Sequence, residues 1–124
     1  MERAAQTLVD TLKETLGKAV VATDVWEKGS RRSLAGHNPQ ETATKMFDDL
    51  FNYMEKSLHE SQFPSLNRYF LIELEKDNAV IVVNFGTIIQ GALINLSIAN
   101  MGKVVSIAVP RLFRAWETVE RRSY

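Results

Sequence analysis

The side chains best suited to chemistry in this sequence are its two histidines and a few neighbouring carboxylates. His37 lies in a polar stretch ahead of a predicted helix, and His59 lies near the end of that helix. An imidazole close to carboxylates could transfer protons or bind a metal. Glu55 and Glu60 are the carboxylates nearest to His59, but at about 100° per residue the three side chains do not share one helical face. His59 is better interpreted as a cation favoured by the carboxyl end of the helix, so we expect no metal site.

Other reactive arrangements are missing from the sequence. Two carboxylate pairs, Asp48-Asp49 and Glu73 with Glu75, are predicted to be solvated surface charges, because carboxylates are seldom buried. The chain has no cysteine, which excludes disulfides and thiolate nucleophiles. It also has no phosphate-binding glycine loop, nucleophile elbow or H-E-x-x-H motif. We therefore expect a protein that is not an enzyme and that holds no cofactor.

Aromatic residues in the middle of the chain could suggest a nucleic-acid platform. Phe63, Tyr69 and Phe70 lie near Arg68, and bases can stack on such side chains. However, 15 basic and 15 acidic residues give a formal net charge of zero, and few cations lie nearby. This charge balance argues against a nucleic-acid partner.

The length and hydropathy of the chain favour one cytoplasmic domain. Its 124 residues are enough to bury a core, and no linker or repeat divides them, so we assign 1–124 to a single domain. Gln90, Asn95 and Asn100 interrupt the longest apolar run, which leaves no segment of membrane-spanning length. The N-terminus lacks the apolar core of a secretory leader.

Hydrophobic periodicity predicts the elements that must position any site. Apolar residues at helical spacing from Glu2 to Leu16 predict a first helix, which Gly17 ends. Runs of β-favouring residues and turn signals predict the rest. The expected elements are a strand over 18–24, a turn over 25–30, a strand over 31–35, a central helix from Asn38 to about Glu60, strands over 68–75, 79–85 and 87–96, and a helix over 100–122.

The last of these segments allows two interpretations, because Pro110 lies inside it. A proline within a helix removes a hydrogen bond and clashes with the preceding turn, at about 3 kcal/mol. Residues 103–109 could therefore form a further strand, which the β-branched residues Val104, Val105 and Ile107 favour. The apolar spacing nevertheless stays helical across Pro110, and we predict one helix that kinks there.

The central helix carries an unusually wide apolar stripe. We expect Asn38 to cap it, with Pro39 in its first turn and Glu41 completing a capping box. The stripe spans roughly 160°, whereas packing on a sheet needs about 100°. The surplus could meet a second copy of the helix, although a broad buried contact would also explain it. The whole apolar stripe consists of Ala43, Met46, Phe47, Leu50, Phe51, Tyr53, Met54 and Leu58.

Four phrases, in their order and spacing, resemble the Roadblock/LC7 domain family, which includes roadblock-type dynein light chains and bacterial MglB-like proteins. They are GKAVVATD over 17–24, LAGHNP over 34–39, FLIEL over 70–74 and SIANMG over 97–102. The resemblance covers nearly the whole chain. The sequence departs from the family in a longer first hairpin turn and in Pro110, which puts in question any partner contact made by the last helix.

This resemblance implies an α+β fold of roadblock/profilin type, with the element order α-β-β-α-β-β-β-α. A five-stranded antiparallel sheet would have the central helix on one face and the terminal helices on the other. The resemblance also implies that two protomers pair through the central helix and the third strand. The interface residues that it implies are Phe47, Phe51, Tyr53, Met54, Tyr69, Phe70 and Ile72.

The function that the resemblance implies is a non-enzymatic, homodimeric regulatory or scaffold module. It would bind a Ras-like, MglA-like small GTPase and modulate its nucleotide cycle. Two alternatives stay open: a small-ligand sensor with a pocket among apolar side chains, and an adaptor in a signalling or motor assembly without a GTPase. Because Phe51 lies near a margin of the stripe, Phe51→Asp is expected to break the dimer and to destabilise the fold less than Phe70→Asp or Val82→Asp.

Overall fold

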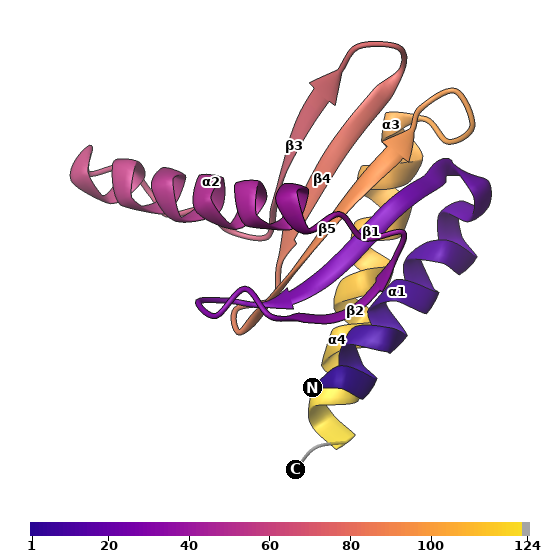
Figure 1. Cartoon of the computed structure of the whole chain (residues 1–124), viewed down its shortest axis with the longest axis horizontal. Coiled ribbons are helices and arrows are strands. Elements are labelled where there is room, and N and C mark those ends of the chain that lie inside the picture. Colours follow the sequence, from indigo (N-terminus) through magenta and orange to yellow (C-terminus); the bar gives the residue numbers. More distant parts are fainter. Residues whose placement is uncertain (123–124) are drawn as a thin grey trace.

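The computed structural model describes residues 1–122 and has the predicted α+β order of elements (Figure 1). The α-helices are α1 (Glu2–Leu16), α2 (Glu41–Glu60), α3 (Met101–Lys103) and α4 (Val109–Arg122). Two further helical segments are the 3₁₀ turn η1 (Gly17–Ala19) and the π-helical segment η2 (Val104–Ala108). The strands are β1 (Val20–Glu27), β2 (Ser33–His37), β3 (Tyr69–Leu74), β4 (Asn78–Asn84) and β5 (Ile88–Asn95).

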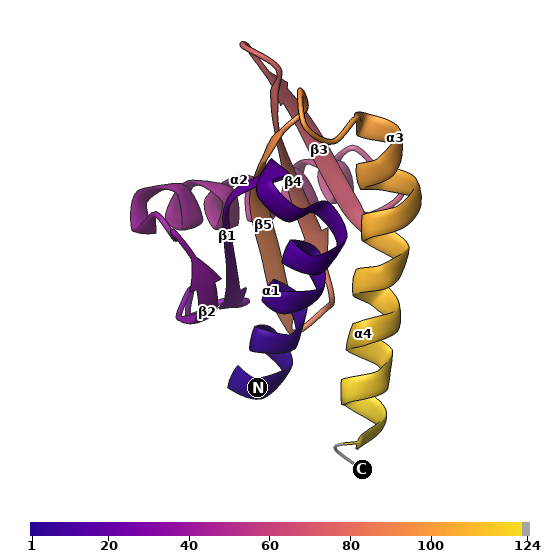
Figure 2. The same cartoon turned by 90° about the vertical axis from the view of Figure 1, so that its right-hand side faces the viewer.

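The five strands form one sheet in the order β2-β1-β5-β4-β3, and every neighbouring pair is antiparallel. α1 and α4 lie side by side on one face, and α2 lies on the other (Figure 2). The predicted five-stranded sheet with helices on both faces is therefore confirmed. β3 and β2 are the two edge strands.

The hydrophobic core is unevenly divided between the two faces. The α1 and α4 side holds a large cluster that includes Leu8, Leu12 and Leu112. The α2 side holds a small one, in which Trp26 and Phe51 are the largest side chains. Since burial of apolar area is the main stabilising contribution, α1 and α4 are attached to the sheet more strongly than α2.

The last helix runs through Pro110 because the turn before it widens. The Val109 N–H donates to the carbonyl of Val104, five residues back, which makes Val104–Ala108 a π-helical turn. A wider turn accommodates a residue that has no N–H and whose ring would crowd a regular α-helix. The prediction of a helix over 100–122 is confirmed, and the alternative strand over 103–109 is wrong.

The first hairpin begins and ends later than predicted. The turn predicted over 25–30 is wrong at its start, because β1 continues to Glu27 and buries both Val25 and Trp26 on opposite faces of the sheet. β2 begins at Ser33, and the turn between them places Gly29 and Arg31 at φ 97° and 63°.

The predicted cap of α2 is also wrong. Asn38 adopts a left-handed backbone with φ 50°, and its side-chain amide donates to the carbonyl of Val21 at 3.2 Å. The residue that precedes the helix is Gln40, whose side chain makes no capping hydrogen bond. A contact with β1 thus replaces the local capping box that the sequence pattern favoured.

Candidate interaction face around helix α2

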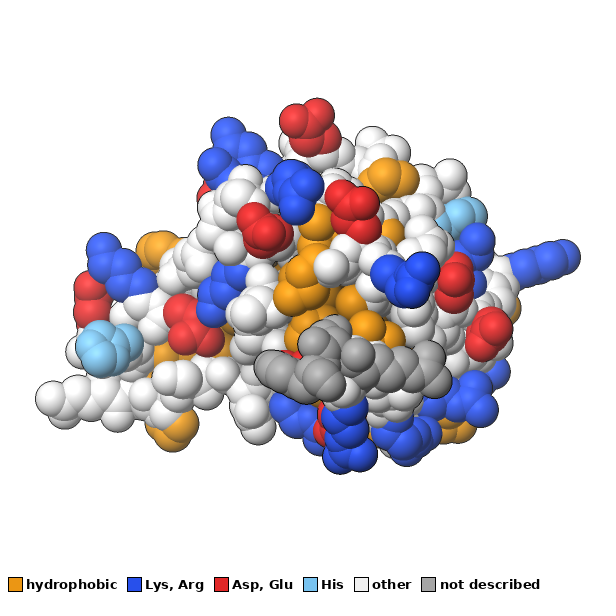
Figure 3. Space-filling model, turned by 90° about the horizontal axis from the view of Figure 1, so that it is seen from below, with side chains coloured by type: hydrophobic (Ala, Val, Ile, Leu, Met, Phe, Trp, Pro, Cys, Tyr) orange, Lys and Arg blue, Asp and Glu red, His pale blue; other side chains and the backbone are white. Residues whose placement is uncertain are grey.

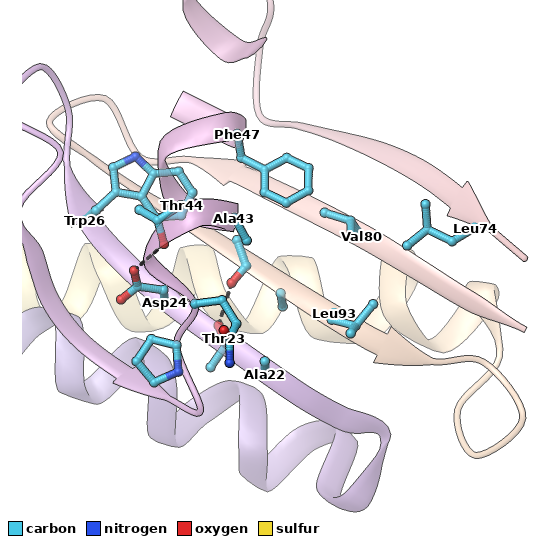
Figure 4. Close-up of a pocket in the computed structure, with 14 residues that line it drawn as sticks. Ala22, Thr23, Asp24, Trp26, Ala43, Thr44, Phe47, Leu74, Val80 and Leu93 are labelled. Atoms are coloured by element: carbon cyan, nitrogen blue, oxygen red, sulfur yellow. Dashed lines mark hydrogen bonds between the residues drawn. The ribbon is translucent and has the colours of Figure 1, made fainter. Parts of the chain in front are cut away.

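α2 is fastened to the sheet by buried polar contacts at its first turns. Asp24 on β1 is buried, and its Oδ2 accepts a hydrogen bond of 2.6 Å from the hydroxyl of Thr44 on α2 (Figure 4). Its Oδ1 accepts one of 2.6 Å from the hydroxyl of Ser33 on β2. One carboxylate therefore joins three elements.

A second polar link lies one turn further along α2. The indole Nε1 of Trp26 donates to Asp48 Oδ1 at 3.0 Å, and Asn52 Nδ2 donates to Asp48 Oδ2 at 3.3 Å. Asp48 is only 2 % exposed, so its predicted role as a solvated charge is wrong. Asp49 does lie at the surface, where it pairs with Arg31 at 3.0 Å.

The ring of Trp26 has room because β5 carries a glycine beside it. A Cβ at Gly91 would stand 3.1 Å from two ring atoms of Trp26. Gly91 pairs regularly with Asp24 and Val82, so it marks no bulge in β5. The missing side chain leaves room for the indole, which hydrogen-bonds to Asp48.

These contacts turn α2 so that only one margin of its apolar stripe, with Phe47 and Phe51, faces the sheet. The residues that α2 buries are Thr44, Asp48 and Phe51. At about 100° per residue, the centre of the apolar stripe lies roughly a quarter turn away from them. One flank of the stripe consequently meets solvent, where Met46 is 54 % and Tyr53 is 69 % exposed.

The carboxyl-terminal half of α2 projects from the body of the molecule (Figure 1). No residue of α2 after Phe51 is buried. Met54 and Leu58 are half-buried, and the loop that follows leaves Phe63 exposed. An apolar helical segment with so little beneath it is a surface suited to a partner.

Beside α2, a strip of the sheet is left uncovered and forms an apolar pocket of about 270 Å³ (Figure 4). Short side chains at Ala22, Ala43 and Gly91 leave this space open. The remaining walls include Phe47 of α2 and three side chains of the sheet, Leu74, Val80 and Leu93. The pocket thus lies between the first turns of α2 and the end of β3.

Tyr69 alternates with Phe70 along β3 and therefore points to the α1 side of the sheet, as Leu71 does. Five of the other predicted interface residues lie on the α2 side: Phe47, Tyr53 and Met54 along α2, and Phe70 and Ile72 on the edge strand β3. We call this combined surface the α2–β3 face. Leu74 at the end of β3 lies within the range Tyr69 to Leu74 that the resemblance implied, whereas Met46, which is exposed on the same helix, was not among the implied interface residues.

Phe51 does not belong to the α2–β3 face. It is 1 % exposed and packs against Phe70, with ring centroids 6.4 Å apart, while the ammonium of Lys28 lies 4.9 Å from its ring centre. Placing it at an exposed margin of the stripe is wrong, because the buried polar contacts of α2 rotate it inward. Its burial is complete whereas that of Phe70 is partial, which removes the reason to expect Phe51→Asp to be the milder change.

The described residues show few other features that suggest chemistry. No group of three or more His, Cys, Asp or Glu within residues 1–122 could hold a metal ion. None of the helices in this part of the chain has the length and hydropathy needed to cross a membrane. On the face seen from below, basic and acidic side chains both surround a central band of hydrophobic ones (Figure 3).

Comparison of the whole fold with solved structures gives clear matches. The structure matches Myxococcus xanthus MglB with a TM-score of 0.74 and 6% identity, over 97% of this chain and 87% of that one. It matches a Roadblock/LC7 domain from Streptomyces avermitilis with a TM-score of 0.62 and 8% identity, over 98% and 96% of the two chains. The chain has the roadblock fold.

The roadblock fold extends to profilins, as the sequence led us to expect. Profilin IB of Acanthamoeba castellanii matches with a TM-score of 0.60 and 16% identity, over 97% of this chain and 99% of the profilin. No protein-family model and no curated protein matches the sequence. In this roadblock fold, the α2–β3 face consists of the one weakly covered helix and the neighbouring edge strand.

Proposed function

We propose that this protein is a non-enzymatic regulatory or scaffold module that forms a homodimer through the α2–β3 face and binds a Ras-like small GTPase. The observation that carries the proposal is the exposed apolar flank of the projecting helix α2, on which Met46 and Tyr53 are largely exposed. The roadblock fold supports it, because the family that the sequence resembles pairs through the same two elements.

Pairing of two copies would cover both apolar parts of this surface, the helix and the strip of sheet beside it. Each copy offers a projecting apolar helix and an uncovered apolar strip of sheet beside it. Fully burying a large apolar side chain is worth about 1.5 to 3 kcal/mol, and the end of a helix without tertiary contacts is marginally stable in water. A second copy thus supplies the contacts that α2 lacks in one chain.

Sedimentation equilibrium at micromolar concentration tests the dimer. We expect the native protein to sediment as a dimer and Tyr53→Asp to sediment as a monomer, because the introduced carboxylate would be buried without a partner. Lys45→Asp is the matched control: it places the same side chain at an exposed position of α2 outside the apolar stripe, and should leave the dimer intact. A native monomer would contradict the proposal.

The proposed GTPase partner would be recognised through the shape of its switch loops. The γ-phosphate and its magnesium ion order these loops, so a partner that contacts only the ordered state gains affinity for the triphosphate form. A difference of about 2 to 3 kcal/mol corresponds to a preference of about 30- to 150-fold. No arginine needs to be supplied for this mode of regulation, which depends on surface complementarity.

Calorimetric titration measures this preference directly. The protein is titrated with a Ras-like small GTPase from the same organism, loaded first with a non-hydrolysable triphosphate analogue and then with diphosphate. We expect tighter binding of the triphosphate form. Equal affinities would remove the regulatory mechanism and leave a scaffold, and no binding to either form would remove the GTPase partner.

A small-ligand sensor is the second candidate, because the accessible surface of the pocket beside α2 is mostly apolar, while Thr23, Asp24, Gln40 and Thr44 are the polar residues that line it. In the proposed homodimer the second copy is expected to cover this pocket, whereas in a sensor the pocket would hold a small molecule. Native mass spectrometry of the purified protein distinguishes them. A small molecule that copurifies at one per chain would favour the sensor.

A further inference from the structure

The apolar pocket beside α2 is larger than the gaps that side-chain packing normally leaves. Its volume is about 270 Å³, whereas protein interiors contain few voids larger than a water molecule. The space exists because small residues from three elements meet there: Ala22 of β1, Ala43 of α2 and Gly91 of β5. The larger side chains around the same open space are Phe47, Leu74, Val80 and Leu93 (Figure 4).

The buried polar side chains at this pocket offer no free hydrogen-bond donor to a ligand. The Thr44 hydroxyl donates to Asp24 Oδ2 at 2.6 Å, and the Thr23 hydroxyl donates to the carbonyl of Gly91 at 2.8 Å. Both oxygens of Asp24 already accept hydrogen bonds within the chain, and Gln40 is exposed. A carboxylate on a ligand would therefore lose its contacts with water without replacement and would lie near a second carboxylate.

We propose that the pocket binds a small, uncharged apolar molecule of about ten non-hydrogen atoms, and that this ligand strengthens the homodimer. The size follows from comparison with an apolar cavity of about 150 Å³, which binds benzene. The ligand site belongs to a single chain, whereas its effect on association rests on the homodimer proposed above.

The ligand would affect association because the pocket adjoins the α2–β3 face. Phe47 lines the pocket and is also one of the residues of that face. If a second copy covered the empty pocket, the walls would lack van der Waals contacts on one side. A ligand supplies those contacts, and the second copy in turn buries the apolar surface that the ligand exposes. Because coupling between two binding events is reciprocal, each should tighten the other.

Naphthalene is a bicyclic hydrocarbon of the proposed size, and the two tryptophans report where it binds. Trp26 lines the pocket, whereas Trp116 packs against Phe85 in the core on the other face of the sheet, with ring centroids 5.6 Å apart. In ¹⁵N-labelled protein each indole N–H gives its own NMR signal. We expect naphthalene to shift the Trp26 signal to saturation and to leave that of Trp116 unchanged. No shift, or a shift of Trp116 alone, would overturn the ligand site.

Charged derivatives of the same probe test the ligand class on the native protein. Naphthoate and naphthylmethylammonium carry the same two rings with one negative or one positive charge. We expect each to bind at least about fivefold more weakly than naphthalene, because apolar walls cannot replace the water around a charge. Equal or tighter binding of either derivative would show that the ligand class is wrong.

A variant that fills the pocket tests its location. Ala43→Leu places a larger apolar side chain on the α2 wall and should abolish the Trp26 shift. Thr42→Leu is the matched control, because it adds the same side chain at the adjacent exposed position outside the pocket and should bind naphthalene like the native protein. Leucine is favourable within a helix, so both variants should fold. Undiminished binding by Ala43→Leu would place the ligand elsewhere.

Sedimentation equilibrium with and without saturating naphthalene tests the effect on association. We expect the dissociation constant of the native homodimer to fall by about fivefold or more, and that of Ala43→Leu to stay unchanged. A native homodimer that does not respond to naphthalene would overturn the coupling. A protein that is monomeric under both conditions would overturn the homodimer and its regulation together, and the Trp26 signal would then decide the ligand site by itself.

Discussion

Asp48 shows how one buried carboxylate decides the orientation of a helix. Its side chain is enclosed and accepts hydrogen bonds from Trp26 and Asn52, so it fixes which side of α2 faces the sheet. A hydrogen bond to a charged group contributes more than one between neutral groups, and an unpaired buried donor is costly. The apolar flank is exposed as a consequence of this polar contact.

We predict that Asp48→Ala lowers the free energy of unfolding by about 1 to 3 kcal/mol, because it leaves the Trp26 indole N–H buried without an acceptor. Asp49→Ala is the control on the adjacent residue. It removes an ion pair whose side chains are 40% and 59% exposed, so its cost should be about 0 to 1 kcal/mol. Urea unfolding of the two variants measures the difference, and equal costs would contradict the role given to Asp48.

Residues such as Asp48, Thr44 and Phe51 are also where reasoning from the sequence failed. A helical wheel assumes that the apolar side of a helix faces inward. Here Thr44 and Asp48 face inward because Asp24 and Trp26, about twenty positions earlier, supply their hydrogen-bond partners. Such a pairing leaves no periodic signal, so the sequence could predict the helix but not its rotation.

At the scale of elements, local patterns were reliable where packing and propensity agree. The bounds of α1 were predicted as observed, because Leu8 and Leu12 recur at helical spacing and Gly17 follows with a positive φ. The start of α2 was not, because Asn38 contacts β1 and does not cap the helix. The register of the sheet depends on distant strands and was not predicted.

The turn between β3 and β4 offers a test at this scale. Lys76 and Asp77 both adopt a left-handed backbone, with φ 59° and 57°, which a side chain disfavours and glycine tolerates. We predict that Asp77→Gly raises the free energy of unfolding by about 0.5 kcal/mol. The same change at Asp10, inside α1, should lower it by about 0.3 kcal/mol, since glycine is less favourable than aspartate within a helix. Thermal unfolding of both variants would show shifts of opposite sign, and a loss of stability in Asp77→Gly would contradict the argument.

At the scale of the whole molecule, the proposed homodimer would make stability depend on association. If only folded chains associate, the homodimer becomes more stable toward unfolding as the protein concentration rises. Each tenfold increase in concentration adds about 1.4 kcal/mol to the free energy of unfolding of the dimer. We predict that the melting temperature of the native protein rises by about 3 °C or more per tenfold concentration. Tyr53→Asp should melt at a temperature independent of concentration. A flat response in both proteins would indicate that the folded monomer is the stable species.

The position of β5 in the sheet also sets when the chain can fold during its synthesis. β5 lies between β1 and β4, although it is the last strand to be made. β1 therefore has β2 as its only strand partner until residues near Asn95 have left the ribosome, whereas β3, β4 and β5 can pair in succession through short turns. Non-local pairing of this kind slows folding, and unpaired strand edges invite wrong contacts meanwhile. The nascent amino-terminal half, with α2 already complete, is thus the stage at which wrong contacts are most expected.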